Sequence, residues 1–372
     1  MGLAGSKFEE SSEKERKDIS KLFAQRALAA TDNDGTYSFR LHPINEENRK
    51  NEVFVLIHDI GHYSFAWRHL EALLVAQGYT VVEYDLIGRG HSTYAPSGEF
   101  GLKDHTDQLR ALLVSQMYSP SCVEYKKIHL LGHSQGGMVA MGFAAQYGDD
   151  PVFQGKLHTV TLLAPAGLMV NAKLDMLQGS GCVRGLVKNM LMSQSAQRAA
   201  WTRDYIDKEL AKHNQRYLEA MHADPRKSQL VSEAIWQVLL QFPMTRTRNM
   251  DVAHKLAEHV QDTGLCMGLI WGDLDETTPY ADSAIFHKIF AGKELAGDDL
   301  TQPITGSNGR YQARTVRGVG HELTHEKYEE VFQYVLEFQR LWAAAAPAVK
   351  AAGEGVDVDV DVDVDVDAVG SN

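Results

Sequence analysis

The sequence is poor in cysteine, with three among 372 residues. Cys122, Cys182 and Cys266 are far apart and odd in number, which excludes a dense disulfide framework and indicates a reducing compartment. No C-x-x-C pair or cysteine–histidine cluster is present. A bound metal is therefore not expected.

Long apolar runs and an excess of positive charge are also missing. No stretch of 18 apolar residues exists, so no transmembrane helix is predicted, and the start of the chain lacks the apolar region of a signal peptide. The formal net charge of -12 disfavours nucleic acid as a partner. We therefore expect a cytoplasmic protein.

Short apolar runs alternate with helical patterns from Tyr37 onward. A continuous run such as Val53–Ile57 is typical of a strand buried on both faces. Alternating strands and helices predict an α/β fold with a mostly parallel central sheet flanked by helices. The predicted strands are 37–41, 53–57, 80–84, 128–131, 157–163, 265–271 and 313–316, and the predicted helices are 64–77, 104–118, 134–147 and 326–343.

This alternation is interrupted between residues 168 and 262. The interrupting segment has helical spacing and holds seven of the twelve methionines, which predicts an inserted helical cap over one end of the sheet. Six Val-Asp repeats near the end predict a disordered tail, with a half-buried strand as the alternative. The predicted units are an N-terminal extension (1–30), an α/β core (37–167 and 263–342), the cap (168–262) and an acidic low-complexity tail (343–372).

The pentapeptide G-x-S-x-G, with Ser134 at its centre, directly follows the predicted strand 128–131. A strand before it and a small-residue helix after it are the setting in which this motif presents a nucleophilic serine on a sharp turn. Gly132 and Gly136 let strand and helix pass closely, and the helix start offers the Gln135 N–H to an oxyanion. The alternative is a glycine-rich turn with Ser134 as an ordinary helix N-cap.

A serine nucleophile needs a basic histidine and a carboxylate that orients it. Asp273, Asp275 and Glu276 follow one predicted strand, and His321 follows the last predicted strand. Loops after strands are where open sheets place their ligand chemistry. These residues are therefore the candidate acid and base.

Two other histidines compete with His321 for the role of base. His325 lies one helical turn further on and is interpreted as a surface histidine at a helix start. His133 directly precedes Ser134, and its side chain should point away from the nucleophile. We therefore interpret it as a structural histidine with satisfied hydrogen bonds.

The motifs around Ser134, Asp275 and His321 together resemble the α/β-hydrolase superfamily, in particular its branch of monoacylglycerol lipases and esterases. The resemblance implies an α/β-hydrolase fold with Ser134 as nucleophile and His321 as base. The family pattern W-G-x-x-D favours Asp275 as the acid over its two neighbours. Five blocks carry the resemblance over roughly residues 37–342: His58-Asp59-Ile60-Gly61, Tyr84–Ser92, Gly132–Gly137, Trp271–Asp275 and Gly320-His321.

One block departs from the family, which usually has His-Gly where this chain has His58-Asp59. By position, the Ile60 N–H is the second oxyanion donor beside that of Gln135. A carboxylate at Asp59 is electrostatically unfavourable there if it points inward.

The resemblance implies acyl transfer through an acyl-enzyme, without a metal or organic cofactor. The expected substrates are small-molecule or lipid esters, monoacylglycerols first. Met169, Trp201 and Trp236 in the cap are predicted to line an acyl-chain channel, although they would equally form the cap's own core. The alternative functions are a C–C bond hydrolase or acyltransferase on the same fold, and a non-catalytic binding protein.

The first residues, Met1-Gly2-Leu3-Ala4-Gly5-Ser6, fit the pattern for N-myristoylation at Gly2. A chance match is the alternative. A single myristoyl chain binds membranes only marginally. The predicted association with the cytosolic face of a membrane is therefore peripheral and reversible.

Overall fold

The computed structural model describes residues 36–41, 48–95, 98–118, 125–179, 181–221 and 225–353. Gly2, the rest of the N-terminal extension and the Val-Asp repeats lie outside these residues, so the predictions made for them stay predictions. Within the described part of the chain, each helix is too short or too polar to cross a bilayer.

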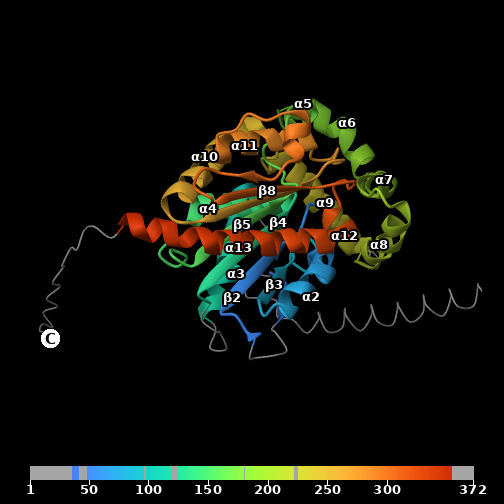
Figure 1. Cartoon of the computed structure of the whole chain (residues 1–372). Helices are drawn as coiled ribbons and strands as arrows, with labels where there is room; N and C mark the ends of the chain where they lie inside the picture. Colours follow the sequence, from blue (N-terminus) through green and yellow to red (C-terminus); the bar gives the residue numbers. More distant parts are fainter. Residues whose placement is uncertain are drawn as a thin grey trace, which may run out of the picture.

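The strands form one mixed sheet in the order β1-β3-β2-β4-β5-β6-β8-β7 (Figure 1). The six inner strands run parallel, whereas β1 and β7 pair antiparallel at the two edges. The strands are β1 (Ser38–Leu41), β2 (Glu52–Ile57), β3 (Thr80–Tyr84), β4 (Lys127–His133), β5 (Leu157–Leu163), β6 (Cys266–Gly272), β7 (Ile304–Thr305) and β8 (Tyr311–Val316). This arrangement confirms the predicted α/β-hydrolase fold class.

The inner strands are buried because their sequences are apolar on both faces. All residues of β3 and β6 are buried, and β2 and β4 are buried except for their first residue. A parallel sheet covered on both faces requires such runs. The two-residue strand β7 was not predicted, since so short a segment has no periodicity.

Two groups of helices flank the sheet. Helix α13 (Tyr328–Gly353) packs against α2 (Arg68–Ala76), β6 and β8, and it lies across the front of the sheet in Figure 1. Helix α4 (Gln135–Tyr147) packs against β4, β5 and the helices α3 (Leu102–Tyr118) and α10 (Arg246–Asp262). Helix α11 (Ser283–Ala291) contacts α10 and β7.

The segment between β5 and β6 is helical, as the sequence indicates. It contains α5 (Ala172–Gly179), α6 (Gly181–Leu191), α7 (Gln194–Asp204), α8 (Lys208–Met221), α9 (Pro225–Gln241) and α10. Helices α5 to α8 gather at one end of the molecule in Figure 1. Because α10 packs on α4, it joins the helices of the core, whereas the predicted cap range 168–262 includes it.

Helix α13 continues to Gly353, beyond the predicted end at Ala343. The predicted tail therefore begins with helical residues. The four alanines directly after Trp342 favour continuation of the helix past Ala343, because alanine has the highest helix propensity.

Candidate active site

Ser134 lies between β4 and α4 with φ 52° and ψ -114°. A positive φ strains a residue that carries a side chain, and surrounding contacts must hold it. Ser134 N donates to Leu163 O at 2.9 Å, and Ala166 N donates to Ser134 O at 3.0 Å. The Ser134 hydroxyl makes no hydrogen bond to the first turn of α4, so it does not act as the side-chain N-cap considered above.

The turn around Ser134 requires glycine on both sides. A Cβ atom on Gly132 would lie 2.2 Å from Gly136 O, and one on Gly136 would lie 2.1 Å from Ile57 O. Backbone carbonyls cannot yield to such overlaps. These two glycines therefore allow β4, α4 and β2 to meet and raise Ser134 above the sheet.

Gln135 opens α4, and its side chain is tied down behind the turn. Arg89 Nη2 donates to Gln135 Oε1 at 2.8 Å, and Gln135 Nε2 lies 3.2 Å from His105 Nε2. The backbone N–H of Gln135 belongs to the first turn of α4, where N–H groups have no partner within the helix. This amide can therefore serve an anion next to Ser134.

Asp275 and His321 meet after the carboxyl ends of β6 and β8, on the same side of the sheet as Ser134, which follows the carboxyl end of β4. Asp275 Oδ2 lies 2.8 Å from His321 Nδ1, and both side chains are buried. Thr278 Oγ1 also donates to Asp275 Oδ2 at 2.9 Å, while the N–H groups of Thr277 and Thr278 donate to Asp275 Oδ1 at 2.9 and 3.0 Å. The carboxylate is thus fixed against the imidazole.

The neighbouring carboxylates are directed elsewhere. Asp273 Oδ1 accepts a hydrogen bond from Gly318 N at 2.7 Å, which joins the loops after β6 and β8. Glu276 is exposed. Of the three carboxylates considered from the sequence, the structure therefore brings only Asp275 to His321.

The pair also determines the protonation of the imidazole. Burial lowers the pKa of His321, but the Asp275 carboxylate and its hydrogen bond outweigh burial and raise that pKa. In the neutral form, in which Nδ1 keeps its proton and donates it to Asp275, His321 has a lone pair at Nε2, and this atom is buried without a hydrogen-bond partner in the described part of the chain. The described contacts include no Ser134–His321 hydrogen bond, a contact that often tightens only when substrate binds.

The rival histidines have other partners. His133 Nε2 lies 2.9 Å from His321 O, which gives it the structural contact predicted for it. The interpretation of His325 as a surface residue is wrong, since it is 5% exposed. Its Nδ1 lies 2.6 Å from Tyr205 Oη and 2.9 Å from Glu322 Oε2, because the cap covers α12 (Leu323–Glu326).

The loop after β2 carries Asp59 and Ile60, the proposed opposite wall of the site. Asp59 Oδ1 accepts a hydrogen bond from Gly61 N at 2.6 Å and lies 2.7 Å from His62 Nδ1. His58 anchors the loop, because its Nε2 accepts a hydrogen bond from Leu86 N at 2.9 Å. The Asp59 carboxylate is thus engaged by its own loop.

The predicted cap residues lie in different surroundings. Trp201 Nε1 donates to His62 Nε2 at 2.9 Å, which places Trp201 against the loop after β2. Met169 and Trp236 are buried in the main hydrophobic core. Their contribution to an acyl-chain channel stays a prediction.

Asp204, at the end of α7, was not identified from the sequence. Thr277 Oγ1 donates to its carboxylate, and a Cβ on Gly320 would lie 2.9 Å from Asp204 O. The cap therefore contacts both loops that carry Asp275 and His321. No local pattern around Asp204 signals this contact, which depends on how α7 docks.

Comparison with known proteins agrees with this fold. A profile of the alpha/beta hydrolase family matches residues 54–334. An uncharacterized protein of Mycobacterium bovis is 37% identical over 95 residues, which is 26% of this chain and 25% of that protein. The alignment thus spans about a quarter of the length of that curated relative.

Solved structures share the fold across most of the chain. A carboxylesterase structure from the thaumarchaeon Nitrososphaera gargenis has a TM-score of 0.57 at 17% identity, covering 85% of this chain and 98% of that one. A 2-hydroxy-6-oxo-6-phenylhexa-2,4-dienoate hydrolase from Rhodococcus has a TM-score of 0.59 at 14% identity, covering 84% and 97%. With the family profile spanning most of the described core, the chain belongs to the alpha/beta hydrolase family.

Proposed function

We propose that this hydrolase cleaves carboxylic esters, with Ser134 as nucleophile, His321 as base and Asp275 as orienting acid. The observation that carries the proposal is the buried Asp275–His321 pair at the sheet edge that also presents Ser134 on a strained turn. A nucleophile, a base and an oriented carboxylate on three separate loops are the parts that acyl transfer needs.

In the proposed reaction, His321 Nε2 takes the Ser134 proton as Oγ attacks the ester carbonyl. The N–H groups of Gln135 and Ile60 stabilise the oxyanion. His321 then protonates the leaving alcohol, and a water activated by His321 releases the acyl group. Asp275 keeps the imidazole in the required tautomer and stabilises its charged form.

Lipid esters such as monoacylglycerols are the preferred substrate class. Ser134 is 5% exposed, and an apolar acyl chain would replace water beside so buried a nucleophile. We place the protein in the cytoplasm, with reversible membrane association if Gly2 is myristoylated. No nucleic-acid partner is expected.

A fluorophosphonate probe tests the proposal, since it labels serines activated by a neighbouring base. Wild-type protein should be labelled, and Ser134→Ala should not. Ser232→Ala, which removes a half-buried serine of the cap, should be labelled like wild type. Labelling of Ser134→Ala would show that another residue is the nucleophile.

A panel of acyl esters of increasing chain length then addresses the substrate. Turnover that rises with chain length supports lipid esters, whereas a flat profile contradicts the lipid preference. Labelling without ester turnover would favour a C–C bond hydrolase or an acyltransferase, and absence of labelling in wild type would favour a non-catalytic binding protein.

A further inference from the structure

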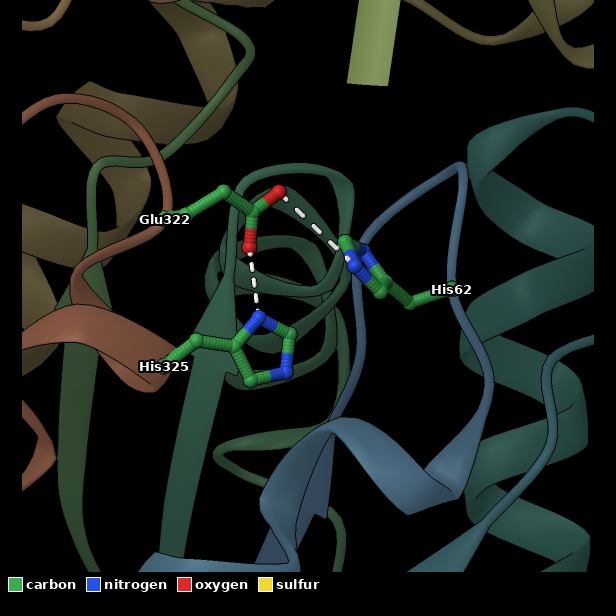
Figure 2. Close-up of side chains that lie close together, drawn as sticks. All are labelled: His62, Glu322 and His325. Atoms are coloured by element: carbon green, nitrogen blue, oxygen red, sulfur yellow. Dashed lines mark hydrogen bonds and ion pairs between the residues drawn. The ribbon is translucent and has the colours of Figure 1, made fainter. Parts of the chain in front are cut away.

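Three buried side chains next to the proposed active site direct ligand atoms at one another. His62 comes from the loop after β2, whereas Glu322 directly precedes α12 and His325 lies within it (Figure 2). Their ligand atoms all lie within 4.8 Å of one another. Glu322 Oε2 is 2.9 Å from His325 Nδ1, and Glu322 Oε1 is 3.7 Å from His62 Nε2.

The hydrogen bonds of His62 fix which of its nitrogens carries the lone pair. The indole N–H of Trp201 can only donate, so His62 Nε2 accepts it. The Nδ1 proton then faces Asp59, 2.7 Å away. His62 is thus held as the tautomer that metal-binding histidines adopt when a carboxylate supports the opposite nitrogen.

The cluster contains more lone pairs that could accept a hydrogen bond than protons that could be donated to them. Glu322 Oε1 is buried and has no hydrogen-bond partner among the residues that the structure describes. His325 Nδ1 is close to both Glu322 and the Tyr205 hydroxyl, although a single nitrogen holds at most one proton. A buried oxygen without a partner is costly, and a cation at this point would satisfy it.

The balance of charge points the same way. Asp59 and Glu322 are two buried carboxylates within this network, and the buried Arg89 guanidinium interacts with Asp59, whereas neutral His62 and His325 add no positive charge. A divalent cation would.

We propose that His62 Nε2, the Glu322 carboxylate and His325 Nδ1 form a binding site for a divalent transition metal such as zinc. Two imidazoles and one carboxylate suit zinc, whereas magnesium and calcium prefer oxygen ligands alone. Tyr205 Oη, next to His325, is an additional oxygen at the site. This departs from the expectation, drawn from the sequence, that no metal is bound.

The sequence around the site contains a spacing that would suggest a different set of metal ligands. His321, Glu322 and His325 follow the order H-E-x-x-H, in which two histidines on one helix bind zinc. Here α12 begins only at Leu323, and His321 is committed to Asp275. The second imidazole of the proposed site therefore comes from His62, far away in the sequence.

Trp201 competes with the metal for the same lone pair of His62. Binding of the metal must therefore displace the indole N–H, which links the site to the docking of α7. Removing this N–H in Trp201→Phe should strengthen zinc binding about fivefold, the equivalent of one net hydrogen bond.

The test uses the full-length chain without an affinity tag, freed of metal with a chelator and then dialysed against zinc. Metal content by mass spectrometry and affinity by competition with a chromogenic chelator should give one zinc per chain for wild type. Glu322→Gln and His325→Ala should lose it, while His254→Ala, at an exposed histidine of α10, should retain it. Circular dichroism checks that each variant is folded.

The proposal is overturned if wild type binds no zinc at equimolar concentration, or if the bound zinc persists in folded His325→Ala. If His325→Ala does not fold, Trp201→Phe decides instead, because weaker or unchanged binding contradicts the shared lone pair. The readout is metal content, so its failure is separate from that of the proposed ester hydrolysis, which the probe reports.

Discussion

The Asp59 carboxylate is paired with His62, with Asp59 Oδ1 and His62 Nδ1 2.7 Å apart. Because the proposed oxyanion donor Ile60 adjoins Asp59, the direction of this carboxylate bears on the chemistry. A negative charge free to turn toward a developing oxyanion would oppose it. His62 and Gly61 N hold the charge on the loop, so the departure from the usual glycine is compatible with an oxyanion site.

This relationship predicts that His62→Phe lowers kcat for an ester by at least about tenfold, because the Asp59 carboxylate loses its partner. The double variant Asp59→Asn/His62→Phe should recover most of that loss, since an asparagine has the same shape without the charge. Steady-state kinetics of the two single variants and the double variant form a double-mutant cycle.

Additive effects in this cycle would contradict the proposed role of His62 toward Asp59. His254→Ala serves as the control for a general effect of losing a histidine, because that residue is exposed on α10. Its kcat should equal that of wild type.

The pairing of Asp275 with His321 could be anticipated from the sequence. Both residues follow apolar runs that read as parallel strands, and the carboxyl ends of parallel strands meet at one edge of the sheet. The glycines around Ser134 likewise carry their own signal, because the turn tolerates no side chain there. Local sequence therefore predicted the sheet and the loops that carry the candidate site, whereas the choice of Asp275 over Asp273 and Glu276 came from the family pattern W-G-x-x-D.

The contacts of the cap could not be anticipated in this way. Trp201 and His62 are 139 positions apart, and their hydrogen bond depends on how α7 docks on the core. The same docking buries His325 through Tyr205, so a residue that reads as the start of a surface helix becomes interior. Helical periodicity predicts which elements form, but not which polar groups they cover.

The choice between neighbouring carboxylates gives a matched pair of variants. Asp275→Asn should lower kcat by about four orders of magnitude, because an amide opposite His321 Nδ1 favours the wrong imidazole tautomer. Asp273→Asn removes a carboxylate that bonds Gly318 N and not His321, so its kcat should stay within about threefold of wild type. Equal losses in the two variants would contradict the assignment of Asp275.

The glycines of the turn predict a difference in stability. Gly136→Ala places a Cβ 2.1 Å from Ile57 O, so we expect the free energy of unfolding to fall by more than about 3 kcal/mol, or the protein to be insoluble. Gly185→Ala meets no atom within 4 Å on α6 and should raise it by up to about 1 kcal/mol. Urea denaturation measures both, and a mild effect at Gly136 would contradict the close approach of α4 to β2.

Glu52 and His129 predict how stability depends on pH. His129 Nε2 lies 3.1 Å from Glu52 Oε2, and this hydrogen bond lowers the pKa of Glu52 to about 2. A carboxylate whose pKa is lower in the folded than in the unfolded state stabilises the fold above its unfolded pKa, and this contribution is lost as the pH falls toward 2. Burial also lowers the pKa of His129. Protonating this histidine at low pH is therefore harder in the folded state than in the unfolded state, which destabilises the fold in acid.

Both groups therefore act in the same direction, and the free energy of unfolding should decrease as the pH is lowered from about 6.5 to 2. Glu52→Gln removes the carboxylate, so its unfolding free energy should depend less steeply on pH than that of wild type below about pH 4.5. Urea denaturation at successive pH values measures both slopes. Parallel curves for wild type and Glu52→Gln would show that the Glu52–His129 hydrogen bond does not lower the pKa of Glu52 in solution.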